Sequence, residues 1–186
     1  MNNYKKIWGY LKKNKIYFLI ILVLFIISIL IGFLFPVFFV EFIKKFILEL
    51  ADKTKNMNFF QLLIFILENN LTTAFFGMLL GVFFGIFPLL LVIFNGYVLG
   101  FVSNKTVGLL GFNVLFKLIP HGIFELPALV LSLGLGLKLG MFIFSKNKKK
   151  YLYENFENSL RIFIYVILPL LIIAGIIETG LIFVLG

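Results

Sequence analysis

Long apolar runs separated by short polar segments dominate this chain, and the lengths of the runs predict membrane-spanning helices. The first run, 16–35, has 20 residues and no charge. At about 1.5 Å per residue, a helix of this length crosses the roughly 30 Å hydrocarbon core of a bilayer. The run is too long for the apolar region of a signal peptide, and no small-residue cleavage site follows it. We therefore predict a first span over 16–35, behind a basic head over 1–15.

The next segment shows a different pattern, because its polar residues recur at spacings of three and four. The charged members are Glu41, Lys44, Lys45, Glu49 and Asp52. Phenylalanines occupy the opposite face, so the pattern predicts an amphipathic helix along the membrane interface. We place it in an outer interfacial segment over 37–67 and interpret it as a membrane-hugging connector, with a partner-binding helix as the alternative.

The longest charge-free run, 69–104, has 36 residues and is too long for one span. We predict one span from near residue 69 to residue 94, ended by Asn95-Gly96, and another over 121–144. Since 121–144 must end at the basic segment that follows, residues 96–119 either cross the membrane or re-enter it, and we favour a crossing. The result is a set of glycine-rich core spans over 69–144, a basic loop over 145–161 and a last span over 162–186.

The positive charges predict the orientation of this bundle. Ten of the 17 cations lie in two flanks: Lys5, Lys6, Lys12, Lys13 and Lys15 before the first run, and Lys146, Lys148, Lys149, Lys150 and Arg161 before the last. The positive-inside rule places both flanks in the cytoplasm. The sequence thus predicts an all-α fold: a polytopic transmembrane helical bundle of about five spans in a single membrane domain, 1–186, with an amphipathic interfacial helix after the first span. We expect a multi-pass plasma-membrane protein with its N-terminus in the cytoplasm and its C-terminus outside.

Composition excludes the main soluble classes. Hydrophobic residues make up 62% of the chain and charged residues 13%, and the mean hydropathy is +1.12, against roughly 45 to 50% apolar and 25% charged in soluble domains. The net charge of +9 follows from topology, and we expect the lipid bilayer and no nucleic acid as a partner. With no cysteine, the chain has neither disulfides nor thiolate ligands.

Glycine spacing predicts how the helices pack. Eleven of the 16 glycines lie between residues 77 and 140. Those spaced four apart, which place small residues on one helix face, are Gly77, Gly81, Gly85, Gly96, Gly100, Gly136 and Gly140. Small residues at this spacing let helix backbones approach closely in lipid. We predict a tightly packed centre, and leave open whether such a face joins a homodimer or other envelope membrane proteins.

Ionisable and amide groups inside the spans are candidates for function because they are costly there. We predict that one polar cluster in the outer half of the bundle gathers Glu68, Asn69, Asn70, His121, Glu125 and Glu178. His121 and Glu125 are four residues apart on one helix face, as metal ligands or a hydrogen-bonded pair would be. Three interpretations stay open: polar groups that hold helices together, a binding or ion-conducting site, and a metal or acid/base site with His121 and Glu125 as candidate ligands. We assign no catalytic residue and expect no cofactor.

The order of these motifs resembles the stage II sporulation protein M family. The resemblance covers about residues 60–186, and its most specific part is the block from Pro120 to Glu125. The residues that carry it are Asn69, Asn70, Asn95, Gly96, Pro120, His121, Gly122, Glu125 and Glu178. The resemblance implies a plasma-membrane protein of about five spans. In spore formers the family member is a membrane partner of cell-wall-degrading proteins during engulfment, and relatives occur in bacteria and archaea that do not sporulate.

Two function classes follow from the residues and the resemblance. The first is a non-enzymatic membrane component that organises or anchors an envelope assembly. The alternative is a transporter or channel-like protein that binds a cation, proton or small solute at the polar cluster. An enzyme of the intramembrane metal-dependent kind is disfavoured, because one histidine without an HExxH motif supplies too few ligands.

Overall fold

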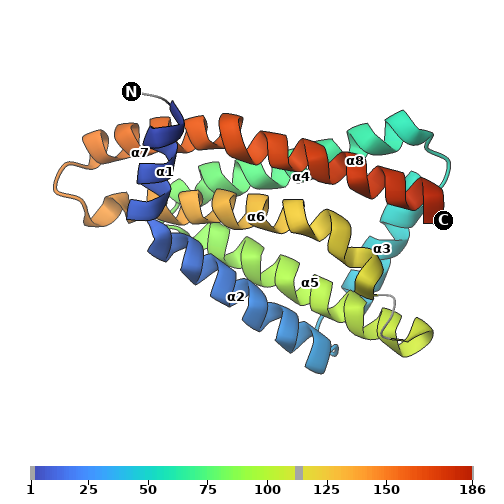
Figure 1. Ribbon diagram of the computed structural model, residues 1–186. Coiled ribbons are helices and arrows are strands. Elements are labelled where there is room, and N and C mark those ends of the chain that lie inside the picture. Colours follow the sequence, from blue (N-terminus) through green and yellow to red (C-terminus); the bar gives the residue numbers. More distant parts are fainter. Residues whose placement is uncertain (1–2, 112–114, 186) are drawn as a thin grey trace.

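The computed structural model describes residues 3–111 and 115–185, and it leaves the side chains of residues 3, 110, 115–121 and 185 undescribed. Its regular elements are all helical within these ranges: α1 (Asn3–Lys13), α2 (Lys15–Leu34), α3 (Val40–Thr54), α4 (Phe59–Leu79), η1 (Leu80–Val82), α5 (Ile86–Leu110), α6 (Leu115–Gly140), η3 (Met141–Phe144), α7 (Lys148–Ile162), η4 (Phe163–Ile167) and α8 (Leu168–Leu185) (Figure 1). Five helical segments are long and apolar enough to cross a membrane. The prediction of an all-α bundle with five spans is confirmed.

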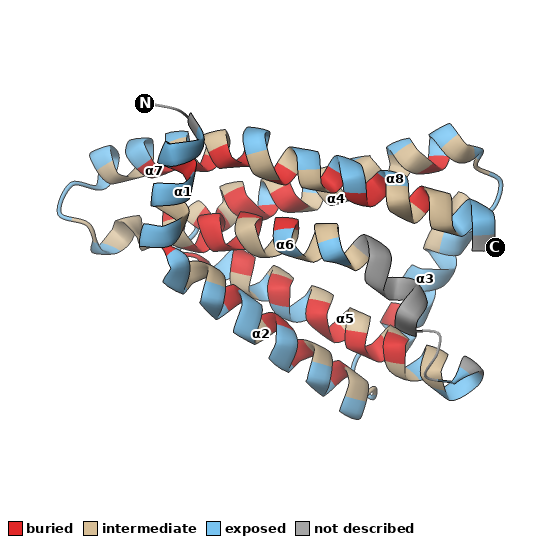
Figure 2. Cartoon of the chain, in the orientation of Figure 1, coloured by how far each residue is buried: buried red, intermediate tan, exposed pale blue. Residues whose placement is uncertain are grey.

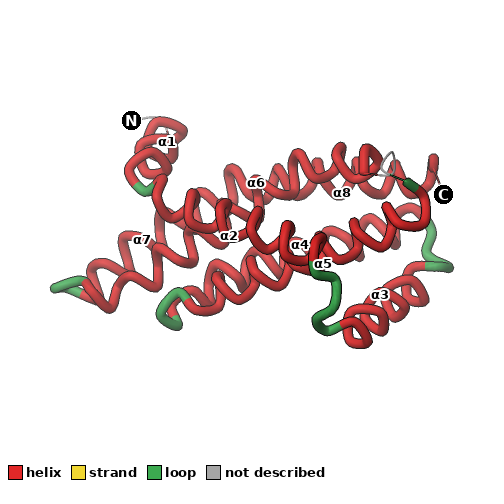
Figure 3. The backbone as a smooth tube through the Cα atoms, turned by 90° about the horizontal axis from the view of Figure 1, so that it is seen from below, coloured by secondary structure: helices red, strands yellow, loops and turns green. Residues whose placement is uncertain are grey.

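The five long helices run back and forth between two ends of the bundle (Figure 1). At one end lie α1, the turn at 83–85 and the start of α7, and we name it the α7 end. At the other end lie α3, the end of α5 and the end of α8, and we name it the α3 end. One loop joins the end of α2 to the start of α3, and another joins the end of α3 to the start of α4 (Figure 3). The two basic flanks therefore lie at the same end of the molecule.

The second span begins earlier than the sequence pattern indicated. Asn58 accepts a hydrogen bond from the Gln61 backbone at 3.0 Å, and the Gln61 side chain accepts one from the Asn58 backbone at 3.0 Å. This capping box satisfies the free N–H groups of the first turn and starts α4 at Phe59. The interfacial segment therefore ends before residue 59 instead of at residue 67. Asn69 and Asn70 lie about three turns inside α4, not at its outer end.

The second span also ends earlier, at a turn in which Phe84 and Gly85 have positive φ angles of 58° and 72°. Glycine adopts this conformation readily, so the chain reverses here and α5 begins at Ile86. The predicted break at Asn95-Gly96 is wrong, because both residues lie inside α5. Residues 86–110 form one continuous helix that runs along the bundle and is long and apolar enough to cross a membrane.

The segment expected as a basic loop over 145–161 is mostly helical. Only the residues before Lys148 form a loop, where the Asn147 side chain caps α7 by accepting from the Lys150 backbone at 3.1 Å. A π-helical turn, Phe163–Ile167, then joins α7 to α8. Pro169 follows this turn and has no N–H to donate, which accounts for a local change in hydrogen bonding.

The seven predicted packing glycines divide between two helix contacts. A Cβ atom at Gly81 would collide with the Gly136 backbone, and one at Gly140 with the Gly85 backbone, so α4 and α5 meet α6 closely near the α7 end. The face of α5 that carries Gly96 and Gly100 packs against α2 and not against α4 or α6. All seven glycines thus face helices of the same chain.

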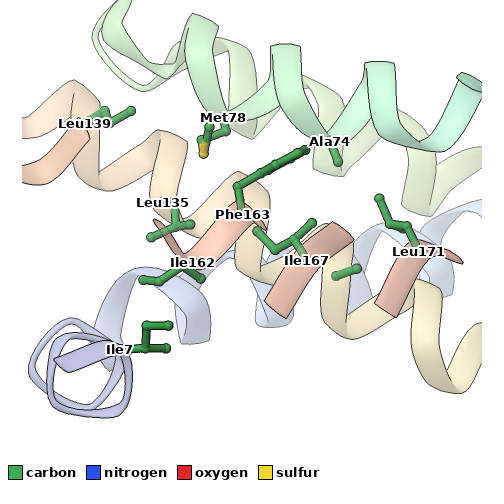
Figure 4. Packing of buried hydrophobic residues seen from close by; sticks show 10 residues of the cluster. Ile7, Ala74, Met78, Leu135, Leu139, Ile162, Phe163, Ile167 and Leu171 are labelled. Carbon is green, nitrogen blue, oxygen red and sulfur yellow. The ribbon is translucent and has the colours of Figure 1, made fainter. Parts of the chain in front are cut away.

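Helix α6 is the central helix of the bundle, since it packs on α2, α4, α5 and α8. Its buried residues are concentrated in the half near the α7 end (Figure 2). An apolar cluster fills that half and brings together α1, α4, α6, α7 and α8 (Figure 4). Its labelled members are Ile7, Ala74, Met78, Leu135, Leu139, Ile162, Phe163, Ile167 and Leu171.

Candidate binding site between α4, α5, α6 and α8

Three cavities meet at Glu125, which lies on α6. The first has a volume of about 660 Å³ and lies between the end of α3, α4, α6 and α8. The second, of about 610 Å³, lies between α2, α5, α6 and α8. The third is a space of about 110 Å³ between α4, α5, α6 and α8. The two large cavities fall within the range of about 300 to 1,000 Å³ that is usual for small-molecule sites.

Glu178 on α8 joins Glu125 in lining both large cavities. Its side chain is half-buried. In the described part of the chain it makes no hydrogen bond or ion pair, and Lys55, which also lines the first cavity, forms no salt bridge with it. A carboxylate inside a membrane span is costly unless it has a partner or water. Glu178 is therefore a half-buried acidic group that faces two cavities without a partner in the described part of the chain.

Amide groups from two further helices surround the glutamates. Asn69 and Asn70 of α4 line the first and third cavities, and Asn95 of α5 lines the second and third. Asn69 donates to Asn70 at 3.4 Å, and Asn95 donates to the Leu91 carbonyl oxygen at 2.8 Å. The Asn95 amide nitrogen is thus used within its own helix, which leaves its side-chain oxygen to accept.

The site does not include every residue expected from the sequence. Glu68, on the same helix α4 as Asn69 and Asn70, is exposed and lines none of the three cavities. His121 falls in α6, but its side chain lies outside the described residues, so its predicted pairing with Glu125 is not described. Gly122, one position later, lines the second cavity.

Asn95, Thr73 and Ser103 also line the cavities, and the candidate cluster inferred from the sequence omitted them. Asn95 had been interpreted as a helix break and as part of the family resemblance, not as a member of the polar cluster. Its presence inside a long apolar run was a usable signal, since polar residues in spans tend to face the bundle interior. Thr73 and Ser103 gave no such signal, because hydroxyl side chains can hydrogen-bond within their own helix.

The cavities stop at a closely packed floor on their α7 side. Ala74 and Leu171 are buried and line the third cavity. Ser132 donates a hydrogen bond to the Ala74 carbonyl oxygen, which ties α6 to α4 at this level. One turn further, a Cβ at Gly77 would collide with the Leu133 side chain, and the contact of Gly81 with Gly136 follows. The bundle is therefore hollow toward the α3 end and closely packed toward the α7 end.

The chemistry of the site is that of oxygen acceptors: two carboxylates and the oxygens of three amides. Among the described side chains, no group of three or more His, Asp or Glu residues is placed to hold a metal ion. The arrangement can act as counter-ion and hydrogen-bond acceptor for a positively charged group.

Comparisons with known proteins identify the family. Residues 21–181 match the sequence model of the family described as stage II sporulation protein M. Over 132 residues the chain is 35% identical to an uncharacterised protein of Methanocaldococcus jannaschii, in a match that covers 67% of this chain and 58% of that protein. The chain thus spans little more than half the length of that relative. No solved structure matches the chain. The chain belongs to the stage II sporulation protein M family.

Proposed function

We propose that this multi-pass protein of the plasma membrane binds a small cation in the hollow half of its bundle, with Glu178 as the counter-ion. The observation that carries the proposal is that the Glu178 carboxylate faces two cavities and has no partner in the described structure. Within a membrane span, a bound cation would offset the cost of this charge.

The surroundings of Glu178 support a cation over an anion. Glu125 lines the same two cavities, so the charged groups next to Glu178 on the bundle side are also negative. The amides of Asn69, Asn70 and Asn95 add neutral oxygen acceptors. Lys55 is the one cation among the described lining residues, and it is exposed at the rim of the first cavity near α3.

The charge distribution supports an orientation for the site. With the basic flanks of α1 and α7 in the cytoplasm, as the positive-inside rule favours, the α3 end faces outward and the cavities lie in the outer half. The packed floor beneath the cavities favours a binding site reached from one side over a continuous pore in this conformation.

A ligand-stabilisation experiment tests the proposal. Purified protein is heated with sodium, potassium, calcium or methylammonium chloride, and ionic strength is held constant with choline chloride. A ligand that binds only the folded state adds about 2.7 kcal/mol of stability at a hundredfold excess over its Kd. We expect one of these cations to raise the Tm of the wild type and of Glu68→Gln, the control at an exposed acid, but not of Glu178→Gln. An equal rise in Glu178→Gln would contradict the proposal.

The second candidate function is the organisation or anchoring of an envelope assembly without enzymatic activity. The observation that favours it is the charged face of α3, which lies outside the bundle with Glu41, Lys44, Lys45 and Glu49 all exposed. Among the described residues these charges pair along α3 itself, in the ion pairs Lys44–Glu41 and Lys45–Glu49. Such exposed pairs contribute little stability, so the face is free to exchange them for a partner's charges. Reversing these four charges would then abolish co-purification of envelope proteins while cation binding stays unchanged.

A further inference from the structure

Resting on the proposed cation site, we infer that the cation bound at Glu125 and Glu178 is amphipathic: an aliphatic ammonium ion whose apolar tail lies in the second cavity. Besides the two carboxylates, this cavity is lined by residues of α2 and α5. In Figure 1 the α2–α5 pair diverges from α8 toward the α3 end, and the residues that line the second cavity come from α2, α5, α6 and α8.

The walls of the second cavity are mostly apolar, and besides the two carboxylates its polar lining side chains are those of Asn95 and Ser103. Phe25 and Ile29 contribute from α2, and Val98 and Val102 from α5. Among its described lining residues, the only charged side chains are the two glutamates. A small hydrated cation would leave these walls against water, whereas an alkyl chain would remove both its own surface and theirs from water.

The first cavity differs in a way that supports this assignment. Its lining includes Thr54, Lys55, Asn69 and Asn70 beside apolar side chains, so it offers more polar groups than the second cavity does. The site thus has a more polar side and a more apolar side, and both carboxylates line both of them. A ligand that matches both sides has a charged head next to the glutamates and a tail that points toward α2 and α5.

The second cavity also reaches the surface that the membrane covers. Ile123 lines the cavity and is 59% exposed, on a helix that spans the bundle. An exposed isoleucine on a membrane span faces lipid, so the cavity is open sideways to the acyl chains. An amphipathic cation dissolved in the membrane can therefore enter the second cavity from the lipid, without passing through the packed floor.

The inference is tested with a series of primary alkylammonium chlorides, from methyl to hexyl, and the full chain in phosphatidylcholine nanodiscs. Binding is measured by titration calorimetry, with empty nanodiscs subtracted. We expect hexylammonium to bind about tenfold or more tightly than methylammonium, since each buried methylene adds to affinity. In Val98→Trp, which fills the second cavity, this ratio should fall to about one. Val23→Trp is the matched control, because Val23 is exposed on α2 and lines none of the cavities; it should keep the ratio.

The outcomes separate the inference from the proposed function. If methylammonium and hexylammonium bind wild type equally well and neither binds Glu178→Gln, the tail assignment is overturned and the cation site stands. If the ammonium ions bind wild type and Glu178→Gln equally well, or bind neither protein, both the tail assignment and the cation site are overturned. The wild-type series alone decides the chain-length question if Val98→Trp does not fold. Nanodiscs that contain phosphatidylethanolamine show whether the ligand is a lipid or a free amine. If this lipid displaces hexylammonium, the ammonium head belongs to an aminolipid; if it does not, the ligand is a free amine. Both results support the amphipathic ammonium class.

Discussion

Glu125 of α6 and Glu178 of α8 line the same two cavities, although more than fifty positions separate them in the chain. Helices α6 and α8 run in opposite directions and pack against each other. Their acidic residues therefore reach the same two cavities from helices of opposite direction. Two carboxylates that line one cavity inside a membrane bundle favour a proton or another cation near them. This shared lining is the structural basis of the proposed cation site.

The glycine contact between η1 and α6 predicts a large difference between two similar variants. Gly81→Ala should lower the free energy of unfolding by about 1 to 3 kcal/mol, because the new methyl group would collide with the Gly136 backbone. Gly180→Ala, in α8, adds the same group where no atom lies within 4 Å, and should be nearly neutral. Thermal unfolding in detergent measures both. A Gly81→Ala protein as stable as Gly180→Ala would show that this contact is not close.

Tyr97 links α5 to the turn that follows α2. Its hydroxyl oxygen accepts from the Phe38 backbone N–H at 2.9 Å and lies 3.0 Å from the Phe35 carbonyl oxygen, to which it can donate. Tyr97→Phe should cost about 0.5 to 1.5 kcal/mol per lost hydrogen bond and make the turn before α3 more sensitive to protease. Tyr153→Phe is the control, because Tyr153 is exposed on α7. Equal protease sensitivity in the two variants would refute a role of Tyr97 in holding the turn.

Tyr10 on α1 predicts a loss of stability at high pH. Burial raises the pKa of Tyr10 well above its usual value of 10.0, and nearby Tyr151 adds to the rise. Its hydroxyl donates to Asn155 Oδ1 at 2.7 Å, which joins α1 to α7. The folded state keeps this proton above pH 10 while the unfolded state releases it, so stability is unaffected by Tyr10 below that pH and falls as the pH rises above it.

The test compares unfolding at about pH 9 and about pH 11, the range in which an unfolded tyrosine titrates. Wild type should lose more stability across this interval than Tyr10→Phe. Tyr4→Phe, which alters an exposed tyrosine of the same helix, should lose as much as wild type. A Tyr10→Phe protein with the wild-type pH dependence would contradict the burial of this phenol.

The orientation can be tested because the natural chain contains no cysteine. Lys149→Cys places a thiol at the α7 end, and Asp52→Cys places one on the exposed face of α3. With the α7 end in the cytoplasm, a membrane-impermeant maleimide added to intact cells should label Asp52→Cys and leave Lys149→Cys unlabelled until the cells are opened. The reverse pattern would refute the proposed orientation.

The number of spans was predictable, whereas the helix ends were not. Run length and the parity of crossings gave five spans without any knowledge of packing. The turn at 83–85 was missed because Gly85 also fits a repeat of glycines at spacing four, and because Phe84 adopts a positive φ that aromatic residues rarely take. Asn95 was taken for a break, yet its amide is satisfied by the Leu91 carbonyl in the same helix. Sequence patterns do not show which of these local solutions the chain adopts.

The site was partly predictable for a related reason. Acidic and amide residues in apolar runs drew attention to Asn69, Asn70, Glu125 and Glu178, since such groups rarely face lipid. The expected depth was wrong for Asn69 and Asn70, because α4 starts at Phe59. The cavities could not be predicted, since they depend on how α2 and α5 diverge from α8. Glycine spacing likewise defines a packing face but not its partner, and Gly100 contacts α2 instead of the central glycine helices.

Direct binding of methylammonium to the protein in phosphatidylcholine nanodiscs tests the central claim that Glu178 is the counter-ion of a bound cation. Equilibrium dialysis with the radiolabelled ion should give one bound ion per wild-type chain and per Glu68→Gln chain, and none above the empty-nanodisc background for Glu178→Gln. One ion per chain in Glu178→Gln, bound as tightly as in wild type, would contradict the account.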